Sequence, residues 1–335
     1  MTLKAVADAA GVSPITVSNV VNGRFQSMGA ETRERVEKAI VQLNYRVNSA
    51  ARSLRHSRQY CVALIVVDQR PSFLSQPAYH QVAAGLSNYL NSHKYALAIE
   101  GVSPEKGTDM SFVDRLSTDA FCLLASGNSR SRLAMLERLQ ASGQPVVVLN
   151  ERPLNDHPNT CYVRSDDFSG GRLMAEHMIA RKSRRVLMLL PDMEWSTMTE
   201  RAAGVQAVVD EHEGVSLDTL RATGISVAEV HDALERHLGV NKPPDALIAG
   251  NDLMAAAAQK FFAKAGYKIP AQVRIGGFGA YEFLQFLQSV ISSIHIPVYE
   301  MGQVAGQQIL QHLANGAFAS PDVLLPVELQ VGEST

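Results

Sequence analysis

The chain has 335 residues, of which 46% are hydrophobic and 19% charged, with a formal net charge of −2. This composition is typical of a soluble globular protein, and the chain is long enough for two or three domains. The sequence contains no run of about 18 apolar residues and no apolar signal segment at its start, so we expect neither a membrane-embedded nor an exported protein.

The charge is distributed unevenly along the chain. Residues 1–58 carry nine lysines and arginines against four acidic residues, a net charge of +5, so the remainder carries −7. A basic segment on an acidic body is expected when only the first part meets a phosphate backbone.

The three cysteines, Cys61, Cys122 and Cys161, lie far apart in apolar runs. An odd, sparse set without paired spacing predicts reduced, buried thiols and a cytoplasmic protein. The ten histidines are scattered as well. We therefore expect no metal site and no cofactor.

Residues 2–22 predict two short helices joined by a tight turn. Thr2 caps the first helix, and Gly11 ends it in a left-handed conformation. Ser13 caps the second helix, and Pro14 stands in its first turn, where a missing N–H does no harm. The apolar side chains that fall where two crossed helices press together are Val6, Ala10, Val12, Val17 and Val20.

The outward face of the second helix is small or polar, which suits a helix lying in a DNA major groove. This face comprises Pro14, Ile15, Thr16, Ser18 and Asn19. An ordinary helical hairpin fits the first 22 residues as well. Residues 31–44 then predict a third amphipathic helix, with Val36, Ile40 and Leu43 along one stripe. Three helices with one shared apolar face favour a helix-turn-helix domain.

Four sequence motifs resemble those of a known protein family. They are L-K-x-V-A-x-x-A-G-V-S from residue 3, T-V-S-x-V-x-N from residue 16, E-T-R-E-R-V from residue 31 and N-Y-x-x-N-x-x-A-R-S-L-R from residue 44. In this order and spacing they make the chain similar to the lactose-repressor (LacI/GalR) family of bacterial transcription regulators. The resemblance covers the whole chain and is densest over residues 2–58.

The resemblance implies an all-α helix-turn-helix headpiece, residues 1–58, in which residues 46–58 form a hinge helix. In the family, two such hinges enter the minor groove, and a leucine from each wedges into a base step. Leu54 matches that leucine, with Ala51 three residues earlier. The residues that we expect to meet DNA are Thr2, Ser13, Pro14, Ile15, Thr16, Ser18, Asn19, Asn22, Asn48, Ala51, Leu54 and Arg55.

The headpiece departs from the family pattern at three positions. Val47 stands where the family usually has proline, so the hinge helix is less pre-organised at its start. Asn19 replaces a frequent arginine, which shifts the expected readout from guanine toward adenine. Gly29 replaces the usual serine cap of the third helix.

After Tyr60 the pattern changes to alternating strands and helices, which predicts doubly wound parallel α/β sheets. The expected strands are 61–67, 95–100, 120–126, 145–150, 185–191, 246–250 and 273–278. The expected helices lie near 79–92, 130–142, 169–182, 198–212, 226–238, 252–266 and 299–315.

This second part is large for a single sheet, so two lobes are expected. The resemblance supplies their arrangement, a periplasmic-binding-protein-like effector and dimerisation domain over residues 59–335. Strands are expected to cross between the lobes near 161–163, 294–297 and 318–321. The first lobe then comprises about 59–162 and 296–319, and the second about 163–295 and 320–335.

In open α/β sheets, ligands bind beyond the carboxyl ends of the strands, which places the effector between the lobes. Arg201 begins the family word R-x-x-G, whose arginine contacts effector oxygens. The alternative for Arg201 is a surface ion pair with Glu200 or Glu194.

Other candidates lie near strand ends and cleft helices. Strand-end capping is the alternative for the asparagines and the aspartate among them, and a place in the core is the alternative for the tyrosine. The full expected effector-binding set is Arg70, Tyr79, Asn150, Asp166, Arg201, Ile225, Asn251 and Gly279.

Three departures bear on the effector. Gly279 stands where many sugar-binding members have an aspartate, and Ile225 replaces an aromatic platform. The loop 68–77 is longer than usual and brings Arg70. Losing a carboxylate while gaining a cation favours an anionic effector, such as a sugar acid or sugar phosphate.

Together these features predict a sequence-specific DNA-binding transcription regulator, a repressor of a carbohydrate-utilisation operon. A sugar, sugar acid or sugar phosphate between the lobes would control it. A near-palindromic DNA operator implies at least a homodimer. One alternative is a regulator of the same fold that a partner protein controls or that acts constitutively. A solute-binding protein is disfavoured by residues 2–58, and an enzyme by the missing nucleophile–base pair and cofactor loop.

Overall fold

The structure is a computed structural model that describes residues 1–21, 23–25, 28–45, 58–103 and 111–335. The chain divides into two compact units, Met1–Tyr60 and Cys61–Thr335. Over the described residues, no helix is both long and apolar enough to cross a membrane. Five residues expected to meet DNA lie outside the described ranges: Asn22, Asn48, Ala51, Leu54 and Arg55.

The first unit contains three helices, α1 (Leu3–Ala10), α2 (Pro14–Val21) and α3 (Ala30–Gln42). The hydroxyl of Thr2 accepts the Ala5 N–H at 3.2 Å, which caps α1. Gly11 ends this helix with φ 64°, a left-handed conformation that glycine adopts without strain. The hydroxyl of Ser13 accepts the Thr16 N–H at 3.2 Å and caps α2. Gly29 precedes α3 without a side-chain cap.

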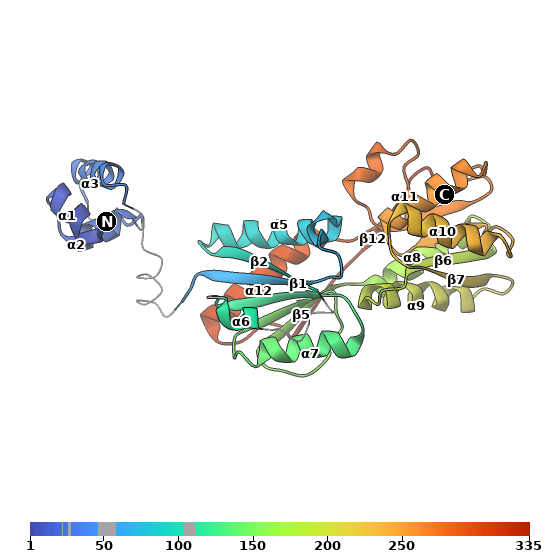
Figure 1. Ribbon diagram of the computed structural model, residues 1–335, viewed down its shortest axis with the longest axis horizontal. Helices are drawn as coiled ribbons and strands as arrows, with labels where there is room; N and C mark the ends of the chain where they lie inside the picture. Colours follow the sequence, from blue (N-terminus) through green and yellow to red (C-terminus); the bar gives the residue numbers. More distant parts are fainter. Residues whose placement is uncertain (22, 26–27, 46–57, 104–110) are drawn as a thin grey trace. The chain divides into compact units, whose positions relative to one another are not determined.

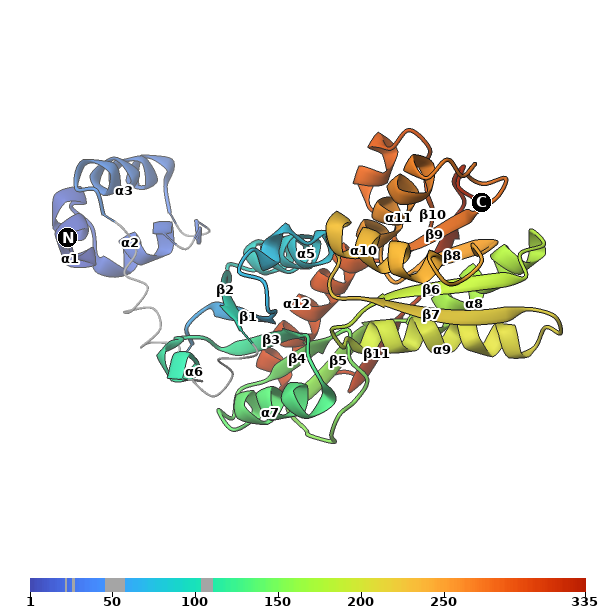
Figure 2. The same ribbon diagram turned by 45° about the vertical axis from the view of Figure 1, so that its right-hand side comes forward.

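One fully buried valine from each helix forms the centre of this unit. Val6 of α1, Val17 of α2 and Val36 of α3 each have 0% of their surface exposed. The three helices pack around this core (Figure 2). Burial of apolar side chains on all three helices stabilises the unit, and it confirms the shared apolar face expected from the sequence.

The second unit contains two six-stranded sheets, one in each lobe (Figure 1). The first sheet has the order β11-β5-β4-β3-β1-β2, and all its strand pairs are parallel. One of its interior strands, the apolar run that starts at Cys61, is buried on both faces. The strands are β1 (Cys61–Val67), β2 (Ala96–Val102), β3 (Ala120–Ala125), β4 (Val146–Leu149), β5 (Thr160–Ser165) and β11 (Asp322–Leu325).

The second sheet has the order β12-β10-β9-β8-β6-β7. Only the pair β10 and β12 is antiparallel. The strands are β6 (Arg185–Pro191), β7 (Ser216–Ala222), β8 (Ala246–Ala249), β9 (Arg274–Gly279), β10 (Ser292–His295) and β12 (Glu328–Gln330).

Helices cover both sheets, as expected for a doubly wound fold. Those of the first lobe are α5 (Pro77–Ser92), α6 (Ser111–Arg115), α7 (Ser129–Gln140) and α12 (Val298–Asn315), with a short 3₁₀ turn η1 (Phe73–Ser75). Those of the second lobe are α8 (Asp167–Ala180), α9 (Ser196–Asp210), α10 (Val227–Leu238) and α11 (Asp252–Lys264), with η3 (Glu282–Phe286). Helices α5 and α12 pack together on one lobe, and α8 and α9 on the other.

The lobe boundaries differ from those expected by a few residues. The expected crossings at 161–163 and 318–321 fall within or just before strands of the first sheet, because β5 continues to Ser165 and pairs with β11. The chain therefore passes between the lobes after Ser165, between His295 and Val298, and between Leu325 and Glu328.

Candidate functional site

The outward face of α2 is the first candidate site. Ile15 is 73% exposed, and Ser13 and Pro14 beside it are exposed as well. The hydroxyls of Ser13 and Thr16 lie 2.9 Å apart. Thr16, Ser18 and Asn19 are half-buried, whereas Val17 and Val20 point into the core. The helix thus presents short side chains outward, as a major-groove helix requires.

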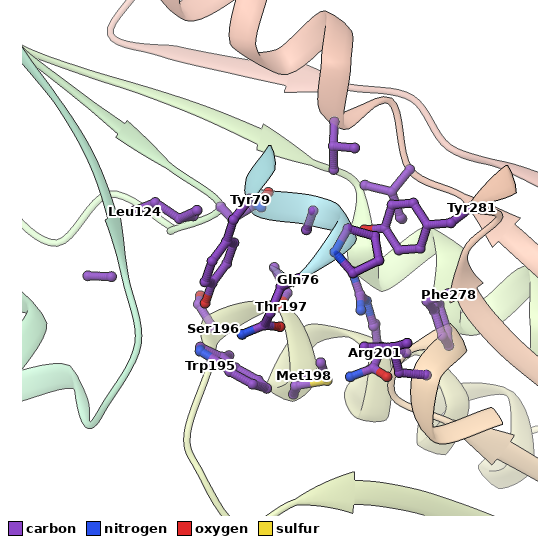
Figure 3. Close-up of a pocket in the computed structure, with 18 residues that line it drawn as sticks. Gln76, Tyr79, Leu124, Trp195, Ser196, Thr197, Met198, Arg201, Phe278 and Tyr281 are labelled. Atoms are coloured by element: carbon purple, nitrogen blue, oxygen red, sulfur yellow. The ribbon is translucent and has the colours of Figure 1, made fainter. Parts of the chain in front are cut away.

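The second candidate site is a cavity of about 90 Å³ between the two lobes (Figure 3). Its first-lobe wall comes from the start of α5, the ends of β3 and β4, and the segment before α12. Its second-lobe wall comes from the starts of α9 and α11 and from the end of β9. All these segments lie at the carboxyl ends of the strands, where the sheet rule places a ligand. The polar lining residues are Gln76, Tyr79, Asn150, Ser196, Thr197, Arg201, Asn251 and Tyr281.

Arg201 lies in the first turns of α9 and is only 7% exposed. Its Nε donates to Asp167 Oδ1 at 2.7 Å, and its Nη1 donates to the Gly250 carbonyl at 2.6 Å. The guanidinium also lies over the Phe278 ring, 4.8 Å from its centroid. The surface ion pair considered for Arg201 is therefore wrong, since Asp167 is its partner and Glu200 pairs with Arg152.

Burial raises the pKa of Asp167, while the charge of Arg201 and the Ser165 hydroxyl act in the opposite direction. The Ser165 Oγ donates to Asp167 Oδ2 at 2.7 Å. The Ser165 hydroxyl holds this carboxylate in place, and the carboxylate together with the Gly250 carbonyl fixes the orientation of the Arg201 guanidinium, which lines the cavity.

Tyr79 is held by a buried carboxylate in the first lobe. Its hydroxyl donates to Asp68 Oδ2 at 3.0 Å, and Gln76 Nε2 donates to the same oxygen at 2.9 Å. Burial and the charge of Asp68 raise the pKa of Tyr79. The phenol therefore stays neutral and presents its ring to the cavity (Figure 3).

The three candidates near strand ends, Asn150, Asn251 and Asp166, differ in whether they line the cavity. Asn150 has φ 55° and lines the cavity. Asn251 also lines it, while its Oδ1 accepts the Met254 N–H at 2.9 Å and caps α11. Asp166 caps α8 by accepting from the Ser169 N–H and hydroxyl, and it lines a separate recess of about 30 Å³.

Gly279 is absent from the cavity lining. A Cβ atom at this position would overlap the ring of Tyr281, which occupies the space next to Gly279 and lines the cavity. Asp252 is fully buried behind it, where it accepts from the Ser293 hydroxyl at 2.6 Å and from the Tyr281 N–H at 3.1 Å. Burial is the main cause that raises the pKa of Asp252 to about 6.

Arg70 and Ile225 lie in a second chamber of about 390 Å³. Trp195 and Leu253 line both this outer chamber and the inner cavity. The expected effector-binding residues thus fall into three places: four in the inner cavity, two in the outer chamber, and Asp166 and Gly279 beside them.

Sequence reasoning missed four residues that shape the cleft: Asp68, Asp167, Trp195 and Tyr281. A signal existed for Asp68, which directly follows the first buried strand. Asp252, which follows Asn251 after a predicted strand, was a strand-end candidate, and it is fully buried. Trp195 is the only tryptophan in the chain, but nothing in its neighbourhood marks it as a cleft residue.

The lining chemistry suits reversible binding of an oxygen-rich small molecule. Arginine, amide and hydroxyl groups offer hydrogen bonds, and aromatic rings offer flat apolar faces. Among the residues that the structure describes, no three His, Cys, Asp or Glu side chains are grouped to hold a metal ion.

Comparison with known proteins gives two family matches. Residues 2–48 match "Bacterial regulatory proteins, lacI family", and residues 175–335 match "Periplasmic binding protein-like domain".

Two curated relatives extend over nearly the whole chain. The ribose operon repressor of Bacillus subtilis (strain 168) is 28% identical over 327 residues, covering 97% of this chain and 96% of the relative. Catabolite control protein A of Staphylococcus epidermidis (strain ATCC 12228 / FDA PCI 1200) is 27% identical over 341 residues, covering 100% and 99%.

A solved structure of the lac repressor dimer bound to operator and the anti-inducer ONPF shares the fold. Its TM-score is 0.82 at 22% identity, and the match covers 100% of this chain and 99% of that one. The chain therefore has a lacI-family DNA-binding headpiece and a periplasmic-binding-protein-like domain, and the relatives that it resembles over its full length are DNA-binding transcriptional regulators and not enzymes.

Proposed function

We propose that this protein is a cytoplasmic repressor of a carbohydrate-utilisation operon, and that a small carbohydrate-derived effector bound between the lobes controls it. The observation that carries the proposal is the inner cavity. There Arg201 is fixed by Asp167 and the Gly250 carbonyl at the junction of both lobes. The full-length relative named for a ribose operon supports the carbohydrate class.

The DNA half of the proposal rests on α2. Its exposed N-terminal end, Ser13 to Ile15, reaches base edges and phosphates together with the half-buried Thr16, and Asn19 favours adenine one turn later. Two copies of this helix read the two halves of a near-palindromic operator, so the working unit is a homodimer.

The effector half rests on the cavity spanning two lobes. A ligand in this cavity contacts Tyr79 and Asn150 on one lobe and Arg201 and Asn251 on the other. Its binding therefore favours one particular arrangement of the two lobes. Control of DNA affinity requires that this closure differ between the DNA-bound and free states. The hydrogen-bonding groups and aromatic rings of the cavity lining suit a sugar, sugar acid or sugar phosphate.

The test begins with selection of a binding site from a palindromic DNA library, followed by titration of that site with sugars, sugar acids and sugar phosphates. We expect one compound to shift operator affinity at least tenfold, about 1.4 kcal/mol of coupling. The direction of the shift identifies an inducer or a corepressor.

Variants connect the effect to the cleft. Arg201→Lys keeps a positive charge beside Asp167 but removes the guanidinium fork, and it should abolish the response while the operator is still bound. Arg138→Lys is the matched control, because Arg138 pairs with Asp114 on the surface. A chain that selects a palindrome but responds to no compound contradicts control by a small molecule, and it favours a partner protein or constitutive repression.

A further inference from the structure

The outer chamber enlarges the cleft well beyond the inner cavity. Small-molecule sites usually span about 300–1,000 Å³. The inner cavity, about 90 Å³, is below this range, whereas the outer chamber, about 390 Å³, lies within it. A ligand confined to the inner cavity would leave the larger space unused.

Trp195 stands at the junction of the two chambers. It lines both of them, and in the inner cavity it lies away from Phe278 and Tyr281 (Figure 3). Sugar rings pack their C–H faces on flat aromatic rings, and an indole offers the largest such face in a protein. A ligand with one ring in each chamber would therefore contact Trp195 near the bond that links its two rings.

Two hydrogen-bond donors at the outer chamber are without a partner. Arg70 Nη2 and Trp195 Nε1 are buried, and neither has a hydrogen-bond acceptor within the part of the chain that the structure describes. Buried donors are almost always satisfied in folded proteins, so two unpaired donors in the lining of one chamber, one from each lobe, indicate a missing acceptor. Both side chains line the outer chamber, where a ligand oxygen can supply it.

Both arginines that line the two chambers already have a carboxylate partner. Arg201 pairs with Asp167 at 2.7 Å, and Arg70 Nε lies 3.5 Å from Asp68 Oδ1. The carboxylate of Glu229 lines the outer chamber as well. An anionic group would lose its hydration without meeting an uncompensated cation among the described lining residues. This pairing argues against the anionic effector that the gain of Arg70 suggested.

We propose that the effector is a neutral saccharide of two linked rings, one in the inner cavity against Arg201 and the other in the outer chamber against Arg70 and Trp195. This inference rests on the proposed function and narrows its effector class. Ligand oxygens accept from Arg70 and Trp195, and a ligand hydroxyl donates to Glu229.

The single tryptophan gives a direct measurement on the full chain. Intrinsic fluorescence would be titrated with neutral disaccharides (cellobiose, lactose, maltose, melibiose), with their component monosaccharides, and with glucose 6-phosphate and glucuronate. We expect one disaccharide to change Trp195 emission and to bind at least tenfold more tightly than its monosaccharides and both anions. Tightest binding by a monosaccharide or by an anion would overturn the inference.

Two variants locate the second ring. Val227 is 45% exposed and lines the outer chamber, so Val227→Phe takes up space in that chamber at little cost to folding and leaves Trp195 as the single tryptophan. Arg70→Gln removes the guanidinium donors. Each should lower the ratio of disaccharide to monosaccharide affinity at least tenfold, whereas Arg130→Gln, an exposed change on α7, should not. An unchanged ratio in both variants also overturns the inference.

Failure of the inference is distinguishable from failure of the proposed function. If a monosaccharide or a sugar phosphate binds the cleft and shifts operator affinity, carbohydrate control holds and only the two-ring neutral ligand is wrong. If no saccharide of any kind shifts operator affinity, both are wrong.

Discussion

At the scale of residues, the cleft depends on one buried ion pair. Arg201 and Asp167 are 7% and 3% exposed, and they join α9 to the start of α8. The position of Arg201 could be predicted from its sequence word, but its partner could not. Asp166 and Asp167 are adjacent, and only the structure shows that Asp166 caps α8 while Asp167 turns inward.

Asp167→Asn should destabilise the second unit by about 3–5 kcal/mol, because it leaves the Arg201 cation buried without its counter-charge. The measurement is urea unfolding followed by the fluorescence of Trp195, which reports on this unit. Glu176→Gln is the control, since its ion pair with Arg172 is on the surface and is worth at most about 1 kcal/mol. Equal effects of the two changes would contradict the buried role.

Asp252 should make stability depend on pH. Burial raises its folded pKa from the ordinary 3.8 to about 6, so the folded chain keeps a proton that the unfolded chain has lost. Its contribution is fully present below pH 3.8 and is lost as pH rises to about 6, by about 3 kcal/mol in total. Relative to Asp252→Asn, the wild type should become less stable across this window. A constant difference between the two proteins from pH 4 to pH 7 would refute this.

At the scale of elements, glycines set how closely the helices pack. A Cβ at Gly204 of α9 would overlap the Phe168 carbonyl at the start of α8, and one at Gly171 would overlap the Arg201 carbonyl. This close crossing places Arg201 within reach of Asp167. A glycine within a predicted helix gives no sign from sequence alone whether it meets a neighbour or solvent.

Gly204→Ala should therefore destabilise the second unit by about 1–3 kcal/mol, although alanine is the better helix former. It should also weaken effector binding, because α9 carries Arg201. Gly239→Ala, at the end of α10 in the same unit, is the control, since a Cβ there comes no closer than 3.4 Å to another atom, an ordinary van der Waals contact. Urea unfolding and effector titration measure both effects, and a stabilising Gly204→Ala would show that the helices can separate freely.

Seven strands could be predicted from their runs of apolar residues, the edge strand β2 among them, whereas the edge strand β7 could not. Central strands such as β1 and β6 are buried on both faces and read as continuous apolar runs. Strand β7 is an edge strand whose polar and apolar residues mix, so its pattern resembles a loop. Strands β5 and β11 were expected to be crossings because sequence does not show which sheet a strand joins.

At the scale of the whole second unit, a few contacts hold the two lobes together around the cleft. The Gly127 N–H donates to the Glu194 carbonyl at 3.0 Å, and Arg152 pairs with Glu200. Both contacts join the first lobe to the second beside the effector cavity. These contacts favour closure of the two lobes even without a ligand. They therefore reduce the free energy that effector binding must supply to close the cleft.

Arg152→Ala should weaken effector binding by up to about fivefold, since a partly exposed ion pair is worth at most about 1 kcal/mol. The folding of each lobe should be unchanged. Effector titration together with urea unfolding checks this prediction. A loss of stability without a loss of affinity would show that the pair supports the fold and has no part in lobe closure.

The central claim is that the cleft and the headpiece are coupled. The measurement that tests it most directly is effector affinity with and without saturating operator DNA, set beside operator affinity with and without saturating effector. Thermodynamic linkage requires the two ratios to be equal, and we predict a common factor of at least ten. An effector that binds the cleft with the same affinity whether or not operator is present would contradict the account.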